Sequence, residues 1–251
     1  MVLVHGLEDA WENWGPFAAQ LDERWRACAL DMPWRAGNDY SWRLEGTPAD
    51  HLEAGLRGLS GGIDLLVGHS FGANALLELL ASRANPPSAP VVLLTPFFRP
   101  PDVELTWELM ARSWHQYTVQ IREGVLAKLG PRGARLDGEL VDRMATMTLQ
   151  RIGTDGFMTV FSQFALSGSL PLASVANPVL ILAGAADTSL GRRQATKLAG
   201  SMVRATLVVE DDYDHFCHTR RPSDVVAHMM RFMEREGAAS RIVAAEREGE
   251  Q

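Results

Sequence analysis

This chain of 251 residues has little cysteine, no clusters of basic residues and no long apolar runs, and each of these properties argues against a class of protein. The two cysteines, Cys28 and Cys217, fall in a predicted buried strand and beside a histidine, so we expect no disulfide framework. No apolar run approaches the ~20 residues that a membrane span requires. The formal net charge is −7, without a local run of Lys or Arg. The sequence therefore predicts a protein that binds neither nucleic acid nor membranes.

The composition is that of an ordinary globular protein. A hydrophobic share of 46% and a charged share of 22% are typical of a globular protein with a large core. The length suits a single α/β domain. The chain opens directly with an apolar strand, which leaves no room for a signal peptide, so we expect a cytoplasmic protein. The sequence leaves open whether it acts alone or as a homodimer.

Short continuous apolar runs alternate with helical segments along most of the chain. Strands buried on both faces read as such runs, because helices cover both faces of a parallel sheet. The predicted strands are residues 1–4, 27–30, 63–67, 91–94, 178–182 and 205–209. This alternation predicts an α/β fold with a mostly parallel sheet flanked by helices.

The alternation breaks between the fourth and fifth predicted strands. Residues 102–169 show only helical periodicity, with three apolar stripes that begin near Trp107, Leu140 and Phe157. We interpret residues 100–169 as a helical lid inserted into a core of residues 1–99 and 170–236. Residues 237–251 are rich in Ala, Glu and Arg, which predicts a frayed helical tail.

A G-x-S-x-G pentapeptide, residues 68–72, directly follows the third predicted strand and precedes a helical segment. A strand, this pentapeptide and a helix together form a nucleophile elbow, which lifts the serine hydroxyl above the sheet edge. Ser70 would then lie near a helix N-terminus, where developing negative charge is stabilised. The alternative is a tight strand–helix turn without catalytic function.

A serine nucleophile needs a base and an acid that orients the base. In this architecture both come from later strand ends, in the chain order Ser, acid, His. Asp187 follows the fifth predicted strand and is the expected acid, although it could instead cap a helix. Asp102 is the reserve candidate for the same role.

The expected base follows the last predicted strand, where two histidines compete. His215 is closer to the strand end and is favoured, whereas His218 is expected to be a loop or cap residue at the mouth of the site. His69 is expected to point away from the Ser70 hydroxyl and to pack against the first strand. The backbone N–H groups of Leu7 and Phe71 are the expected oxyanion hole.

With these pieces in place, the chain resembles members of the α/β-hydrolase superfamily, specifically lidded esterase- and thioesterase-like serine hydrolases. The resembling motifs are residues 3–14, residues 31–37 and residues 215–222. The resemblance implies catalytic Ser70, Asp187 and His215, a helical lid, and neither a metal nor an organic cofactor.

Two features depart from the superfamily pattern. Members usually carry an antiparallel hairpin before the His-Gly strand. Here this hairpin is expected to be missing, either because the start codon is assigned too late or because the sheet is shorter. Trp34-Arg35 replaces a glycine-containing turn and is expected to crowd the site entrance. A serine at the elbow also argues against epoxide hydrolysis and dehalogenation, for which the superfamily uses a carboxylate.

Aromatic residues dominate the predicted lid and entrance. Most of them are expected to form the core of the lid itself, because an isolated helical block must bury its own apolar stripes. The candidates for substrate contact are Trp34, Trp107, Trp114 and Phe161. These residues favour an apolar small-molecule substrate over a sugar or a peptide.

The predicted reaction is hydrolysis of an ester or thioester through an acyl-enzyme. Two alternatives stay open. One is a non-hydrolytic use of the same triad, in a cyclase, a C–C bond-cleaving enzyme or an acyltransferase. The other is a ligand-binding protein on a retired hydrolase scaffold, since a fold alone does not fix the function.

Overall fold

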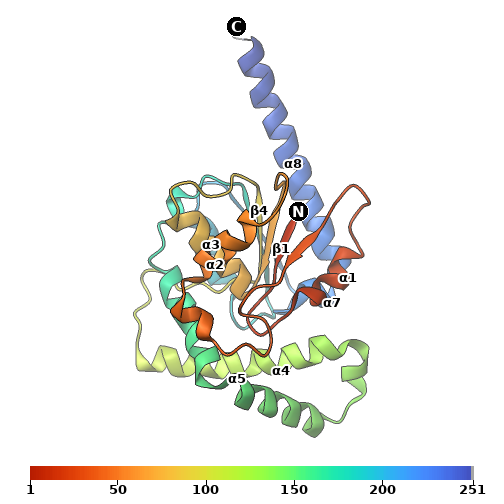
Figure 1. Ribbon diagram of the computed structural model, residues 1–251, viewed down its shortest axis with the longest axis vertical. Coiled ribbons are helices and arrows are strands. Elements are labelled where there is room, and N and C mark those ends of the chain that lie inside the picture. The colour runs from red at the N-terminus through yellow and green to blue at the C-terminus, as the bar shows by residue number, and fades with distance from the viewer. Residues whose placement is uncertain (250–251) are drawn as a thin grey trace.

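The computed structural model describes residues 1–249, and its centre is a six-stranded sheet in the order β2-β1-β3-β4-β5-β6 (Figure 1). All five neighbouring strand pairs are parallel. The strands are β1 Val2–Val4, β2 Cys28–Leu30, β3 Leu66–His69, β4 Val91–Leu94, β5 Val179–Gly184 and β6 Ala205–Glu210. The expected α/β fold with a parallel sheet is confirmed, and no antiparallel hairpin is present among the described residues.

Successive strand residues face two separate apolar clusters, as the two-residue period of a strand requires. Val2 and Val4 of β1 pack into one cluster with the helices α2 (Pro48–Arg57) and α3 (Phe71–Ser82). Leu3 packs into the other cluster with α1 (Gly15–Ala18) and α8 (Pro222–Gly249). Both faces of the sheet are therefore covered by helices.

The remaining helices complete these layers. They are η1 Trp11–Trp14, η2 Ser41–Leu44, α4 Trp107–Leu129, η3 Gly130–Arg135, α5 Gly138–Ser167, η4 Leu172–Ser174, α6 Arg192–Gly200 and α7 Cys217–Arg220. Thr47 caps α2 through a capping box, in which its side chain accepts from the Asp50 amide and the Asp50 carboxylate accepts from the Thr47 amide. No described helix combines the length and the apolar character needed to cross a membrane.

The strand order reverses at β1, and this reversal places the site. The chain leaves β1 for β2 on one side and returns to β3 on the other, with Val4 in register with Gly68. The segments that follow β1 and β3 therefore leave the same edge of the sheet side by side. In open α/β sheets such a crevice is where ligands bind.

Between β4 and β5 the chain forms two long helices, α4 and α5, which lie side by side across one end of the molecule (Figure 1). The three helical stripes of the sequence predict three helical segments, and α5 contains the second and third of them as two helices that meet at a kink. Gly153, with φ +64°, has a non-helical backbone and separates these two helices. Glycine tolerates this left-handed conformation, so the chain bends there without a loop.

Helix α8 continues from the core to Gly249 and extends away from the sheet in Figure 1. The predicted C-terminal tail, residues 237–251, thus begins within a helix that starts at Pro222. Its last two residues lie outside the described part of the chain.

Candidate active site

Ser70 stands between β3 and α3 in a strained backbone conformation. Its φ of 52° and ψ of −119° lie in a region that side chains rarely adopt. A Cβ atom on Gly68 would lie 2.8 Å from the Ala73 backbone nitrogen, and one on Gly72 would lie 2.5 Å from the His5 carbonyl oxygen. Both positions must be glycine because strand and helix backbones pass so close together. The pentapeptide therefore dictates this turn locally.

The structure brings the three expected catalytic side chains together in series. Nε2 of His215 lies 2.8 Å from Oγ of Ser70. Nδ1 of His215 lies 3.2 Å and 3.3 Å from the two carboxylate oxygens of Asp187. The three residues come from the ends of β3, β5 and β6, which meet at one edge of the sheet. His215 and Asp187 are buried, whereas Ser70 is partly accessible.

Ser189 is a fourth member of this arrangement, and the sequence reasoning missed it. Its hydroxyl donates to Asp187 Oδ1 at 2.7 Å and lies 3.0 Å from His215 Nδ1. Its backbone N–H also donates to Asp187 at 2.8 Å. An Asp followed two residues later by Ser is a local turn signal that could have indicated the contact. Asp187 is thus not the cap of α6, whose N-cap is Gly191.

The backbone of His215 is held from two sides. Oγ1 of Thr95 donates to the His215 carbonyl oxygen at 3.0 Å, and Nε2 of His69 lies 2.8 Å from the same oxygen. The His69 ring lies near the rings of His215 and Phe216. It fixes the loop that carries the expected base. The reserve acid, Asp102, lies on the surface in an ion pair with Lys197.

The pKa values of His215 and Asp187 are shifted in opposite directions. Burial alone would lower the pKa of His215, but the charge of Asp187 and their hydrogen bond raise it above its usual value. Burial opposes ionisation of Asp187, whereas His215 and the Ser189 donors keep its pKa below the usual value. Asp187 is therefore a carboxylate at neutral pH, and His215 is a base strengthened by it.

The segment after β1 supplies the other side of the site. Glu8 adopts a positive φ of 54°, and its N–H donates to the Trp34 carbonyl oxygen at 3.0 Å. The Glu8 carboxylate is fixed by Arg151 at 2.7 Å and by the Tyr40 hydroxyl at 3.0 Å. These contacts hold the turn that contains Leu7. The other expected oxyanion donor, Phe71, is the first residue of α3, where backbone N–H groups lack intrahelical acceptors.

A cavity of about 170 Å³ contains Ser70, His215 and Leu7 in its lining. Helices α4 and α5 form the opposite wall, with apolar side chains from Ile121, Ile152 and Val160. Polar groups also reach the lining from the same two helices, among them Tyr117, Gln120, Lys128 and Arg151. The Tyr117 hydroxyl and the Gln120 amide nitrogen are buried without a hydrogen-bond partner.

None of the four expected substrate-contacting aromatics lines this cavity. Trp34 is fully buried in the core, where its indole N–H donates to the His5 carbonyl oxygen at 3.0 Å, so it does not crowd the entrance. Trp107 is 78% exposed, and Trp114 is 42% exposed and packs against Tyr117. Phe161 lines a smaller neighbouring cavity of about 40 Å³. An aromatic residue on a helix or turn can face the core, solvent or a site, and its local pattern does not distinguish these.

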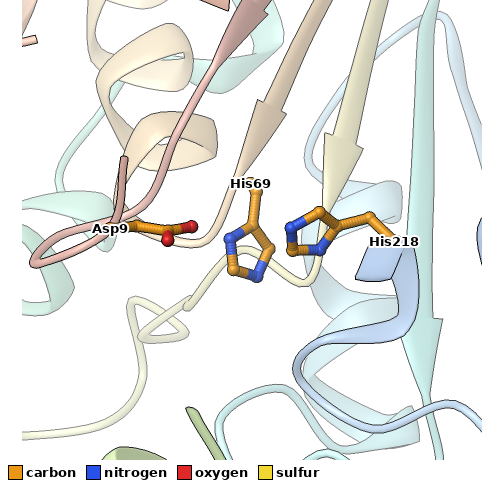
Figure 2. Close-up of side chains that lie close together, drawn as sticks. All are labelled: Asp9, His69 and His218. Atoms are coloured by element: carbon orange, nitrogen blue, oxygen red, sulfur yellow. The ribbon is translucent and has the colours of Figure 1, made fainter. Parts of the chain in front are cut away.

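His218 is buried in α7 and is not at the mouth of the site. Its ring lies against that of His69, with centroids 4.0 Å apart, and both rings lie near the Asp9 carboxylate (Figure 2). Asp9, His69 and His218 form the one group of potential metal ligands that lie close together among the described residues.

The chain matches the model of a family described as "Alpha/beta hydrolase family" over residues 1–229. No curated protein matches it in sequence. Among solved structures it resembles a thermophilic esterase from Thermogutta terrifontis, with 20% identity, a TM-score of 0.58, and 93% and 89% of the two chains covered. A hydrolase from Oleispira antarctica shares 18% identity at a TM-score of 0.63, with 92% and 90% covered.

A bromoperoxidase from Bacillus anthracis is similar as well, with 14% identity, a TM-score of 0.67, and 93% and 91% of the two chains covered. At these identities the solved structures show a shared fold. They include proteins named as an esterase and as a bromoperoxidase, so the chemistry of this chain has to be argued from its own site.

Proposed function

This chain belongs to the alpha/beta hydrolase family, and we propose that it is a serine hydrolase that cleaves an ester or thioester of an apolar small molecule. The observation that carries the proposal is the 2.8 Å contact between Oγ of Ser70 and Nε2 of His215. A serine is a weak nucleophile until an adjacent base accepts its proton. Here the base is in place and is itself held by a buried carboxylate.

In the proposed reaction, Ser70 attacks the substrate carbonyl carbon while His215 accepts the hydroxyl proton. Asp187 keeps the proton of the neutral imidazole on Nδ1, so that Nε2 is free to accept, and stabilises the imidazolium that forms. The carbonyl oxygen gains negative charge, which the N–H groups of Leu7 and Phe71 would stabilise. His215 then protonates the leaving group as the carbonyl re-forms.

The second half of the reaction repeats the same proton transfers with water. His215 removes a proton from water, the resulting hydroxide attacks the acyl-enzyme, and Ser70 recovers its proton as the acid product leaves. Ser189 contributes by holding Asp187 and contacting Nδ1 of His215. Its two donors keep the carboxylate aligned with the imidazole, so we assign it a positioning role.

The character of the cavity supports a small and mainly apolar acyl group. Its volume of about 170 Å³ and its Ile and Val side chains from α4 and α5 favour compact apolar groups. The unpartnered Tyr117 hydroxyl and Gln120 amide offer hydrogen bonds to one polar substituent on the substrate. We propose that α4 and α5 act as the lid over this cavity.

A panel of short- and long-chain nitrophenyl esters and acyl thioesters tests the proposal, with Ser70→Ala as the blank. Hydrolysis that is lost in Ser70→Ala, with one oxygen of the acid product derived from labelled water, is the expected result. Inertness toward every ester and thioester would contradict hydrolysis. Product formation without incorporation of water oxygen would point to cyclisation, or to acyl transfer onto another acceptor.

A further inference from the structure

Beside the triad, three side chains from separate parts of the chain present electron-pair donors to one another. Asp9 follows β1, His69 ends β3 and His218 lies in α7, and their potential ligand atoms all lie within 4.8 Å of one another. Figure 2 shows one ring nitrogen of His69 directed toward Asp9 and one of His218 directed toward His69. All three residues are buried. The proposed hydrolysis uses none of these donor atoms.

The hydrogen bonds around His69 leave one of its ring nitrogens as an acceptor without a donor. Nε2 lies 2.8 Å from the His215 carbonyl oxygen, so in the neutral ring Nε2 carries the proton and Nδ1 carries the lone pair. Nδ1 is buried and has no hydrogen-bond partner among the described residues. It faces the Asp9 carboxylate, which is also an acceptor. A cation held between the two would satisfy the His69 acceptor, although the Asp9 carboxylate also has Asn13 and Lys128 as neighbours.

We propose that Asp9, His69 and His218 bind a divalent transition-metal ion, with zinc as the best-suited ion. Two imidazoles and one carboxylate form a common zinc ligand set, which leaves a fourth position open. Zn–N bonds of about 2.0–2.1 Å place the ligands of a tetrahedral ion roughly 3.4 Å apart. The donor atoms here lie within 4.8 Å of each other, so the distances between them need to shorten by about 1 Å.

Two contacts around these side chains suit a bound metal ion, and one competes with it. Metal-binding histidines typically donate their other ring N–H to a backbone carbonyl, as His69 does to His215. The Asn13 side chain donates to Asp9 and orients its carboxylate. The Lys128 amine lies 3.7 Å from the same carboxylate, and a bound ion would compete with this contact.

The proposed ion position has the cavity on one side and close-packed side chains on the others. Gly6 lines the space in front of His69, where a Cβ atom would lie 3.2 Å from Nδ1. Asp9 and His69 both line the cavity that contains Ser70, so the proposed site borders that cavity. On the far side the Trp14 ring lies 4.9 Å from that of His218. This crowding favours four-coordinate zinc over an octahedral ion.

Calorimetric titration of the chelator-treated, desalted full-length protein with zinc chloride, in a non-chelating buffer at pH 7.5, tests the site. The expected result is one equivalent bound to the wild type, and affinity about tenfold or more weaker in Asp9→Asn and in His218→Gln. His228→Asn is the matched control, because it removes an imidazole that lies 2.9 Å from the Glu210 carboxylate elsewhere on the molecule. This control should bind zinc as the wild type does.

A second readout covers the case in which His218→Gln does not fold. Asp9→Asn keeps the shape of the side chain, and zinc should raise the melting temperature of the wild type but not of Asp9→Asn. Absence of zinc binding, or equal affinity in the wild type and Asp9→Asn, would overturn the site. Because neither readout involves turnover, failure of the metal site and failure of the proposed hydrolysis are distinguishable.

Discussion

Replacing Asp187 by Asn should nearly abolish activity while leaving the fold intact. The carboxylate lies 3.2 Å from Nδ1 of His215 and is almost fully buried. An amide has the same shape, but it can turn its NH₂ group toward Nδ1. The imidazole proton would then move to Nε2, the nitrogen that must accept the proton from Ser70.

The expected loss follows from this change of tautomer. The same Asp-to-Asn exchange in a Ser-His-Asp triad lowers kcat by about 10⁴, which is about 5 kcal/mol of transition-state stabilisation. The Ser189 N–H, 2.8 Å from the carboxylate, can still donate to the amide oxygen of Asn. For this reason the side chain should stay in place, and the melting temperature should change little.

The assay is kcat/KM on the best ester of the panel, together with a thermal melt. Asp214→Asn is the matched control from the loop that carries His215. Asp214 pairs with Arg220 at 2.8 Å and accepts from the Phe216 N–H, and these partners do not include the His215 ring. Asp214→Asn should lose less than about tenfold, since a partly exposed pair of this kind is worth about 1 kcal/mol or less. Comparable losses in the two variants would refute the assigned role of Asp187.

Three further outcomes follow from the same structure. Because the pKa of His215 is raised above 6.5 and the neutral ring is the base, kcat/KM should rise with pH through that pKa, and an acid limb centred below 6.5 would contradict this. In thermal or urea unfolding, Trp34→Ala should lower the free energy of unfolding by about 3–5 kcal/mol, and the exposed Trp107→Ala by less than about 0.5 kcal/mol. Similar losses in the two variants would contradict the burial of Trp34. Gly72→Ala places a Cβ atom 2.5 Å from a carbonyl oxygen and should lower the free energy of unfolding by at least about 1–3 kcal/mol. Gly15→Ala is the control, because its Cβ meets nothing within 4 Å. Equal stability of the two variants would refute the close packing at the elbow.

The sheet and the elbow could be predicted from sequence because their signals are local. Each buried strand is a continuous apolar run, and the parallel order follows from helices between the runs. Residues 68–72 dictate their own turn through two glycines that face backbone atoms. The chain order Ser, acid, His then selects Asp187 and His215, because parallel strands end at one edge of the sheet.

What the sequence could not predict depends on contacts between distant segments. The sequence places Trp34 beside a turn and so predicts an entrance residue. In the structure its indole packs into the apolar core and donates to the His5 carbonyl oxygen. The group of Asp9, His69 and His218 joins residues up to 209 positions apart, and no spacing signal connects them.

Covalent labelling of Ser70 by a fluorophosphonate, mapped by mass spectrometry, tests the central claim most directly. We expect a single adduct on the peptide that contains Ser70 in the wild type, with labelling strongly slowed in His215→Ala, because the probe reacts only with an activated serine. An adduct on another residue, or equal labelling rates in the wild type and His215→Ala, would contradict the claim that His215 activates Ser70.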